Sequence, residues 1–235
     1  MAMLQRNQLV WLSGSAWSAV RAAAWDAQAA EILRHWEAAD LPLVVARQRA
    51  EVPDDRVCLG LPAPLRWGRR RLALDVRADE VCRTGSFPAL AEVFSRLQGA
   101  APQAVTPLCA TLAQPALALP LHVYGSFGWQ ALTGLDYVHA ASDLDVLIGV
   151  NSLPEAVQAA RVLAHWDTPW RVDGELMLPA GHAIAWRELL QASQGAVAHV
   201  LVKHRKCAAL MAWDALHAAL GLAELPVHQG TAVLA

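Results

Sequence analysis

Cysteine is scarce in this sequence, and the few cysteines are far apart. The 235 residues include only four, Cys58, Cys82, Cys109 and Cys207, and no two of them form a Cys-x-x-Cys pair. This spacing argues against both a zinc knuckle and a disulfide framework. We therefore expect a protein of the reducing cytoplasm.

The chain also lacks a long apolar run and a strong net charge. No apolar stretch reaches the roughly 18 residues that a membrane span needs, so we expect no membrane insertion. Lys and Arg number 19 and Asp and Glu number 21, which gives a formal charge of −2. No strong overall field therefore draws the protein to nucleic acid or to an anionic membrane, and any phosphate that it handles must be held locally.

Hydrophobic residues make up 55% of the chain, enough to form a sizeable core. In the first part, an amphipathic helix is predicted over residues 15–38, where apolar residues recur at steps of three and four. Strands are predicted at 42–48 and 70–77, and the Pro and Gly residues between them indicate a connection. These segments predict a small α+β N-terminal domain over residues 1–85.

Strands and helices alternate in the second part, residues 86–235. The patterns predict strands at 121–124, 144–150, 170–178 and 183–189, and helices at 87–97, 126–133, 152–165 and 196–220. We therefore expect an α+β fold, with a mixed sheet flanked by helices in this second part and the active cleft between the two parts.

One short region of the second part carries two acidic residues where burial would favour apolar ones. The predicted strand after the 126–133 helix begins with Asp143-Leu144-Asp145. Because side chains of a strand alternate between its faces, Asp143 and Asp145 point the same way. Two neighbouring carboxylates repel each other unless a proton or a cation lies between them. Mg²⁺ suits such a pair, because it prefers oxygen ligands and is commonly held by one or two carboxylates together with substrate phosphates.

A Gly-Ser turn precedes this acidic pair. Gly125 and Ser126 follow a predicted strand and begin the short helix. Unpaired backbone N–H groups at a helix start can receive phosphate oxygens, the Ser126 hydroxyl can add a donor, and Gly125 allows close approach. Each feature alone is more often an ordinary turn or a solvated strand end. In the order strand, Gly-Ser, helix and strand-borne Asp-x-Asp, they predict phosphoryl or nucleotidyl transfer.

This order of motifs resembles the nucleotidyltransferase superfamily of the DNA polymerase β type. More specifically, "GSFGWQALTGLDYVHAASDLDVL", followed by "RVDGE", "AWREL" and "VLVK", resembles the malonate decarboxylase holo-[acyl carrier protein] synthases, which are phosphoribosyl-dephospho-CoA transferases. The resemblance implies a nucleotidyltransferase-like sheet in the second part. It covers the C-terminal half closely and extends more weakly through the N-terminal part.

The resemblance also implies a reaction. The phosphoribosyl-dephospho-CoA group passes from 2′-(5″-triphosphoribosyl)-3′-dephospho-CoA to a serine of the apo acyl carrier protein subunit of malonate decarboxylase, and pyrophosphate leaves. Asp143 and Asp145 are expected to place magnesium, and Gly125 and Ser126 to hold the terminal phosphates. The superfamily implies a third carboxylate on a neighbouring strand, for which "RVDGEL" offers Asp173, our choice, with Glu175 as the alternative.

Two basic clusters complete the candidates. Residues 203–206, "KHRK", are placed on the predicted closing helix, where they form either a solvated face or a phosphate site with Lys203 as its main member. Residues 69–71 are all Arg, and they either bind phosphates of the dephospho-CoA moiety or protect a strand edge.

Two other functions remain open. The first is a different nucleotidyltransferase that acts on a small molecule, RNA or protein, although near-neutral charge disfavours RNA. The second is a non-catalytic module that binds the acyl carrier protein. The intact acidic pair argues against the second, because a binding module has no need for two converging carboxylates.

Overall fold

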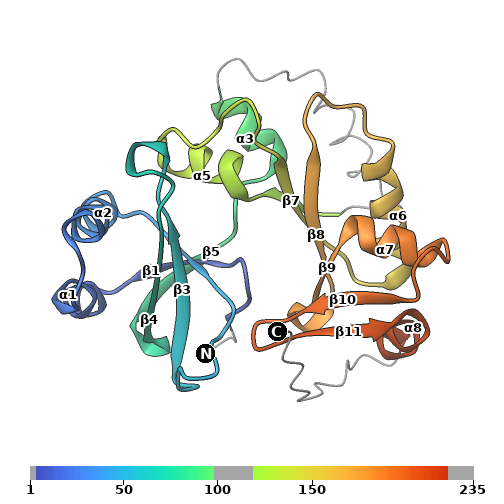
Figure 1. The fold of residues 1–235 in the computed structure, drawn as a ribbon, viewed down its shortest axis with the longest axis horizontal. Helices are drawn as coiled ribbons and strands as arrows, with labels where there is room; N and C mark the ends of the chain where they lie inside the picture. The colour runs from blue at the N-terminus through green and yellow to red at the C-terminus, as the bar shows by residue number, and fades with distance from the viewer. Residues whose placement is uncertain (1–3, 98–118, 222–235) are drawn as a thin grey trace.

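The computed structural model describes residues 4–97 and 119–221, and it consists of two β-sheets with helices outside them. The sheets lie on opposite sides of the middle of the molecule, with some helices on their outer sides and others at one end of the space between them (Figure 1). This arrangement confirms the predicted α+β fold. No helix in these two ranges is long and apolar enough to cross a membrane.

The first sheet is antiparallel throughout and has the strand order β4-β3-β2-β1-β5. Its strands are β1 (Leu9–Leu12), β2 (Leu43–Val45), β3 (Arg56–Pro62), β4 (Arg71–Arg77) and β5 (Val81–Gly85). Strand β3 was not predicted, because Gly60 and Pro62 within it indicated a connection. Proline has no backbone N–H to donate. Because Pro62 is the last residue of β3, no hydrogen bond is lost from the interior of the strand.

Two helices, α1 (Gly14–Ala22) and α2 (Ala27–Ala38), cover the side of this sheet that faces away from the second sheet (Figure 1). The single helix predicted over residues 15–38 is therefore wrong. The Ser13 side chain accepts a hydrogen bond from the first turn of α1, and the Asp26 side chain does the same for α2. The Asp26 cap starts a new helix although the apolar spacing continues across the break.

The second sheet is mixed and has the order β11-β10-β9-β8-β7-β6, with β7 and β8 parallel and the other described pairs antiparallel. Its strands are β6 (Leu121–Val123), β7 (Leu144–Gly149), β8 (Val172–Met177), β9 (Ala183–Ala185), β10 (His199–Lys203) and β11 (Ala208–Ala212). The helices of this part are α3 (Leu90–Arg96), α5 (Gly125–Thr133), α6 (Leu153–Ala164), α7 (Trp186–Ser193) and α8 (Trp213–Gly221).

The end of the chain differs from the prediction. The helix expected over residues 196–220 is instead the hairpin β10–β11 followed by α8, so the basic cluster 203–206 lies at a hairpin turn. The predicted strand at 183–189 is a three-residue strand, β9, that leads directly into α7. The first error concerns Ala-rich segments, whose helix propensity is overridden by strand pairing.

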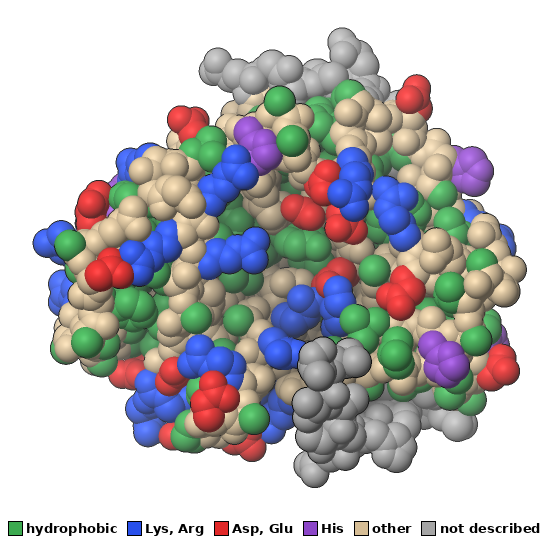
Figure 2. All heavy atoms as spheres, in the orientation of Figure 1, with side chains coloured by type: hydrophobic (Ala, Val, Ile, Leu, Met, Phe, Trp, Pro, Cys, Tyr) green, Lys and Arg blue, Asp and Glu red, His purple; other side chains and the backbone are tan. Residues whose placement is uncertain are grey.

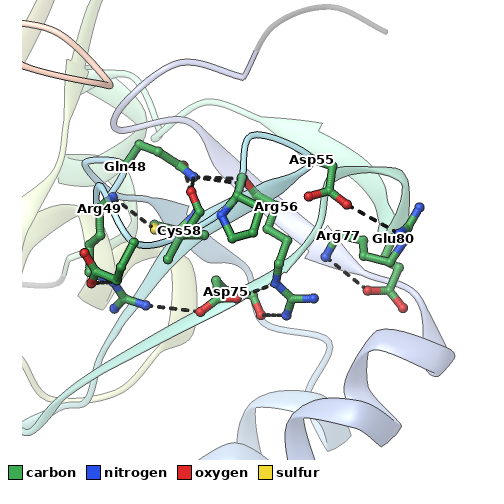
Figure 3. Close-up of polar contacts among 11 residues, drawn as sticks. Gln48, Arg49, Asp55, Arg56, Cys58, Asp75, Arg77 and Glu80 are labelled. Carbon is green, nitrogen blue, oxygen red and sulfur yellow. Dashed lines mark hydrogen bonds and ion pairs between the residues drawn. The ribbon is translucent and has the colours of Figure 1, made fainter.

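The two sheets are joined by contacts between segments far apart in sequence. The Tyr137 hydroxyl donates to the Pro62 carbonyl at 2.8 Å, and the Gln48 N–H donates to the Arg205 carbonyl at 2.7 Å. The Gln48 side chain is buried and also bonds the backbone of its own loop, including the Arg56 carbonyl (Figure 3). These bonds fix both walls of the space between the sheets. The domain boundary near residue 85 stays a prediction.

Candidate active site

A cavity of about 440 Å³ lies between the two sheets. The second sheet and α5 contribute Gly125, Ser126 and Asp145 to its lining, whereas Arg69 comes from the turn before β4 and Arg71 from the start of β4. Figure 2 shows the hollow from its open side, with Lys and Arg side chains along the wall of the N-terminal part and a group of Asp and Glu side chains, with further Lys and Arg beside them, on the opposite side. Among the lining residues, Arg69 and Arg71 therefore lie across the cavity from Asp145.

Gly125 brings the backbone of α5 against the Asp145 carboxylate. Its φ is +60°, in the left-handed region that favours glycine, and a Cβ at this position would collide with the Asp145 side chain. A glycine is therefore required here for two separate reasons. The Tyr124 N–H bonds the Asp145 carbonyl at 3.0 Å, which ties the start of α5 to strand β7.

The first turn of α5 can receive an anion. No side-chain hydrogen bond caps this helix at Tyr124, and the first backbone N–H groups of an α-helix have no partner within it. Ser126 is half-buried at the cavity, and no hydrogen bond of its hydroxyl occurs within the described part of the chain. The helix dipole adds to the attraction for negative charge at this point.

Strand β7 alternates as its sequence predicts. Leu144, Val146 and Ile148 are fully buried in the core that includes α6, whereas Leu147 packs with the core of the first sheet and Asp145 lines the cavity. Asp143 immediately precedes the strand rather than lying within it. The acidic face of β7 is therefore the face that looks toward the N-terminal sheet.

Asp173 lies beside Asp145 in register on the neighbouring parallel strand β8. Gly174, the next residue, faces away, and a Cβ there would collide with the Val146 carbonyl, so the two strands approach closely at this level. The structure thus brings together three of the acids singled out from the sequence. Asp173 itself accepts a hydrogen bond from the Gly174 N–H at 2.8 Å.

The ionisation of Asp145 is affected by its surroundings. Burial, followed by the charges of Asp173 and Asp143, raises the pKa of Asp145 from 3.8 to about 6. Within the described residues, no hydrogen bond or ion pair engages the Asp145 carboxylate. Asp143 differs, because Arg171 Nη1 lies 3.0 Å from its Oδ2. Arg171 was not identified from the sequence, since nothing in its spacing marks it as a partner of Asp143.

These residues fit a magnesium ion of the kind that substrate phosphates help to bind. In residues 4–97 and 119–221, no three His, Cys, Asp or Glu side chains are grouped closely enough to hold a metal by themselves. A half-buried carboxylate without a partner beside two other acids nevertheless favours a cation. Mg²⁺ commonly takes one or two carboxylates and completes its six ligands with phosphate oxygens and water.

Glu175 and Lys203 are engaged with each other. Lys203 Nζ lies 2.9 Å from Glu175 Oε1, and Arg6 from the start of the chain pairs with the same carboxylate. The Glu175 side chain is 7% exposed. Asn7 adds a hydrogen bond at 3.3 Å. Glu175 therefore links the N-terminal segment to β10, and the sequence contained no signal for Arg6, which is 169 positions away.

Comparison with known proteins shows the family of the chain. The family model described as phosphoribosyl-dephospho-CoA transferase MdcG, C-terminal domain, matches residues 89–214, and that of the N-terminal domain matches residues 5–87. The chain belongs to the phosphoribosyl-dephospho-CoA transferase family. Members of the family are transferases, so the protein is an enzyme of this class.

Relatives in the phosphoribosyl-dephospho-CoA transferase family match over most of their length. A phosphoribosyl-dephospho-CoA transferase of Xanthomonas euvesicatoria pv. vesicatoria is 42% identical over 91% of this chain and 97% of its own. The transferase of Bradyrhizobium diazoefficiens is 37% identical over 84% and 85%, and that of Pseudomonas putida strain W619 is 33% identical over 93% and 100%. No solved structure matches the chain.

Proposed function

We propose that the protein transfers the phosphoribosyl-dephospho-CoA group from 2′-(5″-triphosphoribosyl)-3′-dephospho-CoA to a serine hydroxyl of the apo acyl carrier protein subunit of malonate decarboxylase, with release of pyrophosphate. One observation carries the proposal beyond family membership. The uncapped start of α5 and the Asp145 carboxylate open into one cavity between the sheets, so a phosphate seat and an acidic group lie side by side. A cytoplasmic location accords with the dispersed cysteines.

In this reaction the serine oxygen attacks the α-phosphorus of the triphosphate. A new P–O bond forms to serine, the bond to the β-phosphate bridging oxygen breaks, and the serine loses its proton. The N–H groups of the first turn of α5 and the Ser126 hydroxyl donate to the terminal phosphates and stabilise the leaving pyrophosphate. Their positions are fixed before the substrate arrives, because Gly125 packs against Asp145.

The acids act on the other side of the reacting phosphorus. Asp143 and Asp145 would hold Mg²⁺, which when bound would neutralise charge on the phosphate oxygens. Asp173, in register with Asp145, serves as the third carboxylate and either accepts the serine proton or completes the metal site. The sequence also predicts Lys203 as a phosphate ligand. Its ammonium group pairs with Glu175, which lies on the same face of β8 as Asp173.

A direct assay tests the function. The protein is incubated with Mg²⁺, the triphosphoribosyl precursor and the apo carrier protein, and the intact mass of the carrier and the released pyrophosphate are measured. The expected result is a mass gain of one phosphoribosyl-dephospho-CoA group and one pyrophosphate per carrier. A carrier whose acceptor serine is replaced by alanine is the control. A folded, magnesium-loaded protein that modifies no carrier would overturn the proposal.

A further inference from the structure

Two arginines of the N-terminal part, one in the turn before β4 and one at the start of β4, line the cavity with no partner among the described residues. Arg69 and Arg71 are exposed and line the cavity that also contains Gly125 and Ser126. Within the described residues, neither guanidinium has a hydrogen bond or an ion pair. Arg70 between them differs, because it points elsewhere and pairs with Asp26. The two cavity arginines are therefore available to a ligand in a way that their neighbour is not.

Other arginines near strand β4, unlike the two at the cavity, have acidic partners. Asp75 lies four residues after Arg71 on the same face of β4, and its carboxylate is held between Arg49 and Arg56 (Figure 3). At that end of the face, both cations therefore have an acidic partner, and Arg49 also pairs with Glu51. At the cavity end, Arg71 has no acid within the described chain. The positive charge is thus concentrated where the cavity opens.

The backbone at Arg69 is strained. Its φ is +56°, in the left-handed region, directly after Gly68 at +65°. A non-glycine residue in this conformation costs roughly 1 kcal/mol, and Gly or Asn would fit the turn more easily. The turn itself therefore does not explain an arginine at this position, whereas a side chain directed at a ligand does.

Residues of the neighbouring strands β2 and β3 also line the cavity. Arg71 is in register with Pro62, and Gly60 is in register with Val44 on the neighbouring strand. Val44, Gly60 and Pro62 line the cavity. A Cβ at Gly60 would already be 3.4 Å from a Val44 methyl group. Gly60 therefore adds no side chain to this part of the cavity lining.

We propose that Arg69 and Arg71 bind the 5′-diphosphate of the dephospho-CoA part of the donor, while the start of α5 receives its triphosphate end. This inference rests on the proposed function, whose donor carries a diphosphate at the 5′ position of its adenosine and a triphosphate on the ribosyl group attached at the 2′ position. Each phosphate group then has its own binding site, one on each wall of the cavity. Arginine suits this role because its planar fork donates two parallel hydrogen bonds to phosphate oxygens.

Two probe ligands distinguish these two phosphate-binding sites without requiring turnover. 3′-Dephospho-CoA carries the diphosphate alone, and inorganic tripolyphosphate stands in for the triphosphate end. Affinities are measured by calorimetry in the presence of Mg²⁺. Arg69→Ala and Arg71→Ala are each expected to weaken 3′-dephospho-CoA binding roughly ten- to a hundredfold, as expected when a charge-assisted hydrogen bond is lost, and to change tripolyphosphate binding less than threefold. Arg70→Ala is the matched control and should bind both probes as the wild type does.

A second variant guards against misfolding. Arg69→Gly removes the side chain and relieves the left-handed backbone, so its melting temperature should not fall while its affinity for 3′-dephospho-CoA does. Normal 3′-dephospho-CoA binding by both cavity-arginine variants, or equal weakening by Arg70→Ala, would overturn the inference. A wild-type protein that shows the expected binding pattern but modifies no carrier would overturn the proposed function and leave this inference standing.

Discussion

The carboxylate of Asp145 lies against the α-carbon of Gly125, with no space for a side chain between them. This contact makes the phosphate seat and the acidic group a single rigid unit. Gly125→Ala should therefore reduce transfer at least a hundredfold, because the new methyl group displaces the Asp145 carboxylate and the first turn of α5 together. The measurement is the initial rate of carrier modification at saturating donor.

Gly134 supplies the matched control for this change. It ends α5 with a φ of +69°, and a Cβ there would meet nothing within 4 Å. Gly134→Ala therefore bears the same left-handed backbone cost, about 1 kcal/mol, without a collision. It should lower the melting temperature by a few degrees and leave the rate nearly unchanged. Similar rates in the two alanine variants would show that the contact with Asp145 has no role.

The core of this unit could be predicted from the sequence because its signals are local. Gly125-Ser126 and Asp143-Leu144-Asp145 are each runs of adjacent residues. Strand alternation alone predicts that Asp145 and Val146 point to opposite faces of the sheet. The choice of Asp173 as a third carboxylate rested on the family resemblance. Its register with Asp145 could not be predicted, because neither strand alone specifies the parallel pairing of β7 and β8.

The parts that could not be predicted depend on distant partners. Glu175 meets Arg6 and Lys203, which lie 169 and 28 positions away, so no spacing indicates the pairing. Residues 196–212 have Ala-rich segments that favour a helix, but pairing of β10 with β9 and β11 makes them strands. The break between α1 and α2 had a local signal, Asp26, that the continuous apolar spacing obscured.

Asp145→Asn should abolish transfer and yet stabilise the metal-free protein at neutral pH. The pKa of Asp145 is about 6 when folded and 3.8 ordinarily, so the folded state holds this proton more tightly. The free energy of unfolding of the wild type therefore falls as pH rises from about 4 to about 6 and stays lower above that. Asparagine avoids this loss, which is about 1–2 kcal/mol at pH 7 after allowance for partial exposure.

Chemical denaturation from pH 3.5 to 8 measures this difference. The advantage of Asp145→Asn should be absent below pH 4 and complete above pH 6. Mg²⁺ with tripolyphosphate should stabilise the wild type and not the variant, with weaker stabilisation below pH 6 as protons compete. Asp136→Asn, at an exposed acid outside the cavity lining, is the control. A pH-independent gap between Asp145→Asn and wild type would contradict the elevated pKa.

Asp173→Asn and Glu175→Gln should separate the third catalytic carboxylate from a structural one. Asp173 faces Asp145 across the strands, so its amide variant should lose most transfer activity with little change in melting temperature. Glu175 is buried against two cations, so Glu175→Gln should lower the melting temperature markedly. Rates are compared well below each melting temperature. Full activity in Asp173→Asn, together with a rate loss in a stable Glu175→Gln, would assign the role to Glu175.

A double-mutant cycle with Glu175 tests whether the role of Lys203 is structural or is to bind donor phosphates. If its ion pair is mainly structural, Lys203→Met and Glu175→Gln should each destabilise, and the double variant should recover part of the loss, with a coupling free energy of about 1–3 kcal/mol. Activity should then follow stability. If Lys203 instead contacts the donor phosphates, Lys203→Met should raise the KM for the donor at unchanged melting temperature, with coupling to Glu175 near zero. Because the ammonium lies 2.9 Å from a carboxylate that is nearly excluded from solvent, we expect the first result.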